Sequence, residues 1–235
     1  ASIASVRAQD FTDWEMAVVL DGSRPRTKAV VAAIAEHDRR VRAYAHPKSA
    51  RYGELYRDPI IRESKAELVC HLSDDDVFLA GHLASLVAML ERAEWVTEAP
   101  LRLDPGQGSV WLPTNYGTAP MRQAIAARRQ IPSGLNYVAY RREAYLRLPE
   151  GWTCAPWAAG ASDLFMWSKF FKDARLTVAC TAQTSALKFP SGIRARKAWK
   201  PEKRLAEIAP WLARAAEPGL ARKLQLEASV FERLA

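Results

Sequence analysis

Three consecutive carboxylates stand at the end of an apolar stretch: residues 67–72 run through Ser73 into Asp74, Asp75 and Asp76. Like charges at the end of a buried strand repel one another, so a site that keeps them ionised usually holds a cation. Hard oxygen ligands suit Mg²⁺ or Mn²⁺, which commonly bridges protein carboxylates to the phosphates of a ligand. The alternative is that Asp75 or Asp76 caps the helix that follows. The apolar strand before the triplet favours the cation site.

Three further residues could contribute chemistry. Asp21 ends the apolar run 16–20 and could accept hydrogen bonds from a base or a ribose, or simply form a turn. Arg51 could pair with a diphosphate through two hydrogen bonds or contact a base, and an ordinary surface arginine fits the spacing equally well. Asp163 lies in the first turn of a helix that begins near Ser162. It could act as a general base, or serve only the helix macrodipole.

The common motifs of other chemistries are missing from the sequence. The four histidines show no H-x-x-x-H spacing, and the three cysteines form no C-x-x-C pair. There is no phosphate-binding G-x-x-x-x-G-K-[ST] loop and no G-x-S-x-G nucleophile elbow. The net charge of +8 includes a basic run over 194–204. Such a run is more often a solvated face, although it could steer a nucleotide or touch an anionic lipid.

Strands and helices alternate along the chain in a way that would bring these residues together. Apolar runs over 16–20, 67–72 and 176–180 predict strands, and helical spacing predicts helices over 28–37, 49–64 and 83–90 and from Ser162. This alternation predicts an α/β fold with a mostly parallel central sheet flanked by helices. In open sheets of this kind ligands bind at the carboxyl ends of strands, where the acidic residues lie.

Size and composition agree with a globular protein. The 235 residues include 49% hydrophobic and 26% charged residues, which suits one principal domain. The longest nearly apolar run, residues 79–90, is shorter than the ~18 residues that a membrane span requires. The first residues lack the pattern of a secretory signal, so we expect a cytoplasmic protein.

Four segments come in an order that resembles the inverting glycosyltransferases of family 2. They are residues 5–15, the strand end 18–23 with Asp-Gly-Ser, the Arg-Tyr-Gly of 51–53, and the Leu-Ser-Asp-Asp-Asp of 72–76. No single motif is specific, but their succession and spacing are. The resemblance extends over about residues 1–190. It implies a GT-A fold as a domain over 1–192, with a basic, helical C-terminal extension over 193–235.

The resemblance also implies roles for individual residues. In that family the Asp after the second strand contacts the nucleobase, and the acidic cluster holds the ribose and the metal. Carried onto this sequence, the nucleotide-binding residues are Asp21, Arg51 and Asp74. The metal ligands are Asp75 and, beside it, Asp76, with Mn²⁺ or Mg²⁺ as the cofactor.

A later aspartate of the family deprotonates the acceptor hydroxyl, and Asp163, within Gly160-Ala161-Ser162-Asp163-Leu164, resembles that general base. Two departures stand out. Many members carry a carboxylate where this sequence has Ser73. The strand with which the family begins would need about twenty residues before Ala1, and we expect a nucleotide site without its contribution.

The expected function is metal-dependent, inverting transfer of a sugar from a nucleoside-diphosphate sugar, a UDP-sugar first of all. The acceptor would be a hydroxyl of a glycan or of another molecule. The alternative is a non-catalytic module that binds a nucleotide sugar or a polyanion. Nucleic acid is not an expected partner. The basic run leaves open a peripheral contact with the inner face of the membrane.

Overall fold

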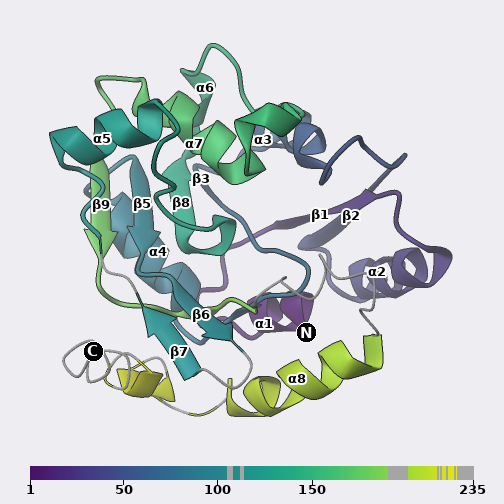
Figure 1. Ribbon diagram of the computed structural model, residues 1–235. Helices are drawn as coiled ribbons and strands as arrows, with labels where there is room; N and C mark the ends of the chain where they lie inside the picture. The colour runs from purple at the N-terminus through teal and green to yellow at the C-terminus, as the bar shows by residue number, and fades with distance from the viewer. Residues whose placement is uncertain are drawn as a thin grey trace.

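The computed structural model describes residues 1–104, 108–111, 114–189, 201–215, 217, 219, 220, 222–224 and 226. Strands and helices alternate along this chain, which confirms the α/β class (Figure 1). The helices are α1 (Ser2–Arg7), α2 (Pro25–His37), α3 (Arg57–Glu63), α4 (His82–Leu90), α5 (Ala119–Ala126), α6 (Arg142–Leu146), α7 (Ser162–Phe171) and α8 (Pro201–Arg214). The strands are β1 (Met16–Asp21), β2 (Val41–His46), β3 (Leu68–Cys70), β4 (Val77–Phe78), β5 (Trp95–Glu98), β6 (Leu101–Asp104), β7 (Gly108–Trp111), β8 (Val138–Arg141), β9 (Val178–Thr181) and β10 (Ala186–Leu187).

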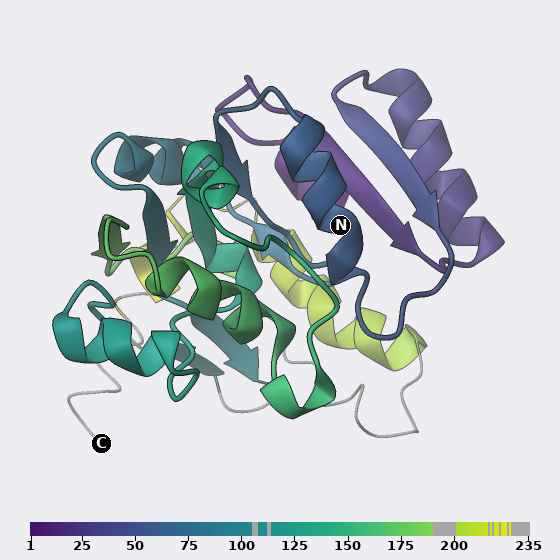
Figure 2. The same ribbon diagram turned by 90° about the horizontal axis from the view of Figure 1, so that it is seen from above.

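The strand pairing is mixed. β1 and β2 run parallel as one pair, and β5 and β9 run parallel within a four-stranded sheet of order β3-β8-β5-β9. β8 lies antiparallel between β3 and β5, and the pairs β4/β10 and β6/β7 are antiparallel. Figure 2 shows β1, β2 and α2 on one side of the molecule, beside the four-stranded sheet. The expected parallel pairing therefore holds for two of the strand pairs, while β8 reverses the direction at the centre.

One predicted helix is shorter than expected. The sequence predicted a helix over 49–64, whereas the chain forms a turn, a 3₁₀ helix over Glu54–Tyr56, and then α3 from Arg57. Gly53 has a φ of 73°, a left-handed conformation that interrupts helical backbone. Pro59 in the first turn of α3 suits a helix start, because a missing N–H costs nothing there. The helix predicted from Ser162 is confirmed as α7.

Aromatic side chains fill the core beneath α7. Trp95 of β5 and Trp167 of α7 are both completely buried, with ring centroids 5.9 Å apart in an edge-to-face arrangement. Such pairs add about 0.5–1.5 kcal/mol beyond the burial of their area. Tyr140 of β8 lies against the same tryptophan, with centroids 6.2 Å apart. This packing fixes α7 against the four-stranded sheet.

The helical C-terminal segment packs on the body of the protein. Ile208, Trp211 and Leu212 of α8 lie against a buried cluster that includes Val77 and Leu187. Figure 1 shows α8 at the end of the molecule away from α5, α6 and α7. The basic run of 194–204 lies largely outside the described residues, so the boundary proposed at residue 192 stays a prediction. Within the described part of the chain, no helix is long and apolar enough to cross a membrane.

A buried carboxylate ties three elements together. Glu98, at the end of β5, is 1% exposed. Its Oε2 accepts hydrogen bonds from the backbone N–H and the hydroxyl of Ser185, at 2.8 and 2.6 Å, and its Oε1 accepts one from Ser85 at 2.7 Å. His82 Nδ1 lies 3.3 Å from Oε2. Burial opposes ionisation, but His82 and the two serines together lower the pKa of Glu98 below its usual value.

Replacing Glu98 by alanine should lower the free energy of unfolding by about 3 kcal/mol, because several buried donors lose their acceptor. Urea denaturation measures this change. Glu91→Ala is the matched control, since Glu91 is exposed and should change stability by less than ~0.5 kcal/mol. Equal effects of the two substitutions would contradict the proposed importance of this network.

Candidate active site

Asp21 is held at the end of β1 by residues that follow β2. The parallel register pairs Asp21 with His46, which brings the next turn of the chain alongside. The N–H of Ser49 donates to Oδ1 at 2.5 Å, its hydroxyl donates to Oδ2 at 3.1 Å, and Lys48 forms an ion pair with Oδ2. Burial raises the pKa of Asp21, but Lys48 and Ser49 outweigh it and hold the pKa below its usual value. This carboxylate is therefore ionised and fixed in direction.

Two glycines allow the chain to pack closely around Asp21 and Lys48. Gly53 has a φ of 73°, and a Cβ at this position would lie 2.8 Å from the Cβ of Asp21. Gly22 has a φ of 63°, and a Cβ there would lie 2.5 Å from the Cβ of Lys48. Both positions need a left-handed backbone and an absent side chain. The backbone at Gly53 therefore lies closer to Asp21, and the backbone at Gly22 closer to Lys48, than a residue with a side chain would permit.

Arg51, predicted to bind the nucleotide, contacts a loop of the protein in this structure. The side chain is buried, and Nη1 donates to the carbonyls of Ala155 and Pro156 at 2.9 and 3.0 Å. Nη2 donates to the carbonyl of Gly160 at 2.8 Å. Nearby, the carboxylate of Glu54 accepts the N–H of Ala155 at 3.3 Å. Arg51 therefore fastens the loop that leads into α7, a role that the sequence did not suggest.

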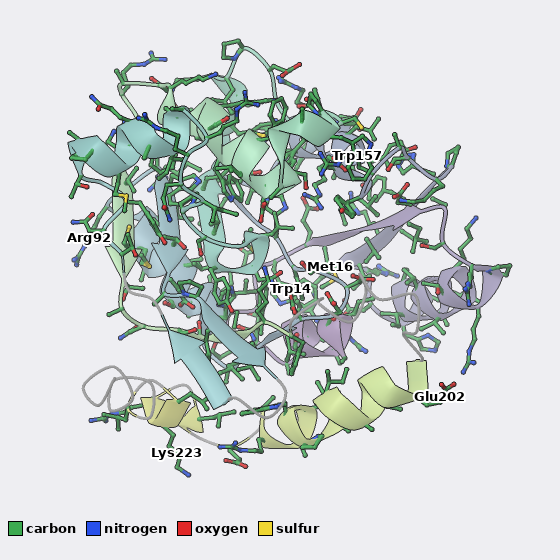
Figure 3. All side chains as sticks on the ribbon, in the orientation of Figure 1. Trp14, Met16, Arg92, Trp157, Glu202 and Lys223 are labelled. Carbon is green, nitrogen blue, oxygen red and sulfur yellow. The ribbon has the colours of Figure 1, made fainter. Side chains whose placement is uncertain are left out.

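The same loop carries an exposed tryptophan. Trp157 is 69% exposed, and the guanidinium carbon of Arg51 lies 4.4 Å from its ring centroid. Figure 3 shows Trp157 at the end of the molecule away from Glu202 of α8. Three other tryptophans, Trp95, Trp152 and Trp167, are buried in the core. Trp157 differs from them, because it lies on the exposed loop that Arg51 binds.

Arg57, the first residue of α3, lies close enough to Glu54 and Asp163 for their charges to act on it, a placement that the sequence did not reveal. It is half-buried, with its guanidinium 4.5 Å from the ring centroid of Trp152. Burial lowers the pKa of Arg57, while Tyr140, Glu54 and Asp163 oppose that shift by their charge. Its guanidinium makes no hydrogen bond to a described residue. The sequence placed Arg57 inside a long helix, so its position at a helix start was hidden.

Asp76 is buried and already bonded through both oxygens. It is 3% exposed; Oδ1 accepts the N–H of Phe189 at 2.8 Å, and the amide of Asn136 donates to Oδ2. Burial, together with the charge of Asp75, raises the pKa of Asp76 to about 6. Asp76 therefore fits a metal ion less well than Asp75, and instead connects three distant segments.

Asp74 and Asp75 lie nearer the surface. Asp74 is exposed and Asp75 is half-buried, and the carbonyl of Asp74 accepts the hydroxyl of Ser2 at 2.9 Å. Over the described ranges, no three or more His, Cys, Asp or Glu side chains gather closely enough to hold a metal ion by themselves. Mg²⁺ is typically bound by one or two carboxylates together with substrate phosphates. Asp75 fits that mode of binding.

Asp163 lies in the first turn of α7, as predicted. Its Oδ1 accepts the N–H of Leu164 at 2.9 Å. Burial raises the pKa of Asp163 above its usual value, against the opposing charges of Lys188 and Arg57. The helix is anchored one turn later, where Trp167 Nε1 donates to the carbonyl of Ser133 at 3.2 Å. A half-buried carboxylate of raised basicity on a fixed helix is suited to proton abstraction.

His71 packs among aromatic side chains of the core. Its Nε2 lies 2.9 Å from the hydroxyl of Tyr140, and its ring centroid lies 5.5 Å from that of Trp152 and 6.3 Å from that of Trp167. Burial and the charge of Arg57 keep the pKa of His71 well below its usual value. The imidazole is therefore neutral at physiological pH.

A family model decides the relationship of this chain to known proteins. The model described as Glycosyl transferase family 2 matches residues 1–147, more than half of the chain. The chain belongs to glycosyl transferase family 2. This confirms the resemblance deduced from the residues before β1, from Asp21 and from the Asp74–Asp76 cluster.

Individual proteins are also similar to this chain. The GalNAc(5)-diNAcBac-PP-undecaprenol beta-1,3-glucosyltransferase of Campylobacter jejuni subsp. jejuni serotype O:2 is 30% identical over 86 residues, which are 37% of this chain and 28% of that protein. TarS 1-349 of S. aureus, solved with UDP-GlcNAc, has a TM-score of 0.61 at 15% identity over 97% of this chain and 66% of that one. The mannosyltransferase PcManGT of Pyrobaculum calidifontis, solved with GDP-Man and Mn²⁺, has a TM-score of 0.56 at 16% identity.

The last of these alignments covers 100% of this chain and 70% of PcManGT. These structural similarities show that the family 2 chain has a GT-A fold. The chain spans less than a third of the curated relative and just under two thirds of the TarS structure.

Replacing Arg51 by alanine should loosen the 155–160 loop, because three carbonyls lose a charged donor. We expect at least tenfold faster hydrogen exchange at the amides of Ala159 and Gly160, which close turns within this loop. Arg51→Lys should restore part of the protection. If Arg51→Ala instead weakened nucleotide binding and left these exchange rates unchanged, the originally predicted nucleotide contact would be the correct role.

Proposed function

We propose that this protein is an inverting glycosyltransferase that moves a sugar from a nucleoside-diphosphate sugar to a hydroxyl group. The observation that supports this most strongly is Asp163, a carboxylate of raised pKa on an anchored helix, in a chain of family 2. Attack by the acceptor from the face opposite the leaving group gives a single displacement with inversion. Asp163 takes the proton of the acceptor hydroxyl as this bond forms.

The nucleoside end of the donor would lie against Asp21. Its ionised carboxylate, aligned by Ser49 and Lys48, can accept hydrogen bonds from a base. Asp74 is proposed to contact the ribose. Because the guanidinium of Arg51 is occupied by the loop carbonyls, Arg57 is better placed than Arg51 to donate hydrogen bonds to the donor. A UDP-sugar is the donor that we propose first.

A divalent ion, Mn²⁺ or Mg²⁺, would be held by Asp75 together with the diphosphate, with Asp76 supporting the turn from behind. When bound, the ion would neutralise negative charge on the departing diphosphate. His71, which precedes the acidic cluster, packs its neutral ring against Trp152 and Trp167, and these rings are proposed to keep water away from the reacting groups. Electrostatic interactions are stronger in such surroundings.

The acceptor is proposed to be a sugar hydroxyl of a growing glycan. The name of the C. jejuni relative describes a lipid-linked oligosaccharide acceptor. An acceptor of that kind would bring a cytoplasmic enzyme to the inner face of the membrane, and the basic residues of 194–204 would favour anionic lipid.

Replacing Asp163 by asparagine should reduce sugar transfer at least about a thousandfold while donor binding persists, because the amide cannot accept the proton. A panel of nucleotide sugars with Mn²⁺ measures transfer as release of nucleoside diphosphate, and calorimetry measures binding. Asp13→Asn, an exposed aspartate before β1, is the control that should retain full activity. Donor binding without transfer in the unmodified protein would instead support the non-catalytic binding module.

The pH dependence of kcat/KM should show an acidic limb above the ordinary Asp value of about 4. Asp163 must be ionised to act as a base, and its pKa is raised, so activity falls as pH falls through that raised value. Removing the neighbouring charge in Arg57→Met should raise the pKa further and move the limb to higher pH. A limb at or below pH ~4 in the unmodified protein would refute Asp163 as the base.

A further inference from the structure

The strand pair β4/β10 places a lysine opposite the acidic cluster. The antiparallel register pairs Leu187 with Val77, and the N–H of Phe189 donates to Asp76 at 2.8 Å. Lys188 therefore lies across from Asp76. Its own N–H donates to the carbonyl of Leu101 at 3.2 Å, which fixes its backbone.

The side chain of Lys188 passes over Gly134. A Cβ at Gly134 would lie 2.9 Å from Nζ and 3.8 Å from Cδ of the lysine, so the glycine leaves room for it. The adjacent Ser133 accepts the indole N–H of Trp167, one turn after Asp163 on α7. Residues four apart share a helix face. The ammonium of Lys188 thus reaches the face of α7 that bears Asp163.

The charge of Lys188 acts on two carboxylates, Asp76 and Asp163. Within the described ranges, its ammonium forms no ion pair and no hydrogen bond. Its charge nevertheless counteracts the effect of burial on the pKa of Asp76 and of Asp163. Lys188 is half-buried, so the residue is partly accessible to a ligand. An anion that enters between Asp76 and Asp163 would meet this cation.

The geometry points to Lys188 as a ligand of the β-phosphate of the donor, an assignment that rests on the proposed function. In a single displacement the leaving diphosphate lies on the side of the sugar opposite the base, toward Asp75. An ammonium is a compact charge that binds phosphate oxygens well. Lys188 is the described cation that β4/β10 and Gly134 together place between Asp76 and Asp163.

The chemistry balances without any change of charge on the lysine. The bond between the anomeric carbon and the β-phosphate oxygen breaks, and its electron pair stays on that oxygen. The acceptor oxygen bonds to the anomeric carbon, and its proton passes to Asp163. Lys188 keeps its proton and donates hydrogen bonds to the phosphate oxygens, which gain charge as the sugar departs.

Calorimetry with UDP and UMP in the presence of Mn²⁺ tests this assignment. Lys188→Met should weaken UDP binding about tenfold or more and UMP binding far less, because only UDP has the β-phosphate. Lys188→Arg should recover part of the UDP affinity. Lys65→Met is the matched control, since Lys65 is exposed in the loop before β3 and should leave both affinities unchanged.

A purely structural lysine would give another result. Equal losses of UDP and UMP affinity in Lys188→Met, or no loss of either in a variant that melts like the unmodified protein, would overturn the assignment. Those results would leave the proposed function intact, because the unmodified protein would still bind UDP. If the unmodified protein bound no nucleoside diphosphate among UDP, GDP and ADP, the proposed function would fail and this assignment with it.

Discussion

The buried carboxylate of Asp76 holds the centre of this structure in place. Burying a carboxylate is costly unless donors replace the lost water, and here Asn136 and the N–H of Phe189 supply them. These donors come from 60 and 113 positions away in the chain. Asn136 also accepts the N–H of Ser73 at 2.7 Å, so the whole acidic turn is fixed. The hydrogen bonds of Asp76 thereby fix the backbone next to Asp75 and, through Phe189, the backbone next to Lys188.

The buried guanidinium of Arg51 fixes the loop before α7, as Asp76 fixes the acidic cluster. Arg51 gives its donors to the carbonyls of Ala155, Pro156 and Gly160, and a buried charge with these partners is specific in geometry. The loop that it holds leads directly into α7. Side chains that already have protein partners thus fix the acidic cluster and the loop before α7. Arg57 and Lys188, whose cationic groups make no hydrogen bond within the described part of the chain, are proposed for ligands.

The sequence singled out candidate site residues at strand ends and helix starts, because apolar runs and turns mark such places. Asp21, the Asp74–Asp76 cluster and Asp163 were singled out in this way, and their roles stay predictions. Arg57 and Lys188 were not singled out, since their proposed roles depend on the break at Gly53 and on the β4/β10 register, which no local pattern shows. The direction of β8 was missed for a similar reason. A buried strand has the same apolar composition whether it runs parallel or antiparallel to its neighbours.

The surroundings of Asp163 connect donor binding to catalysis. Burial raises the pKa of this carboxylate, while the charges of Lys188 and Arg57 act in the other direction. A diphosphate bound near those two cations would offset part of their charge. The carboxylate would then become a stronger base when the donor is present, since the opposing positive field is reduced. Under the proposed function, the same cations that bind the leaving group would thereby restrain proton abstraction until the donor has bound.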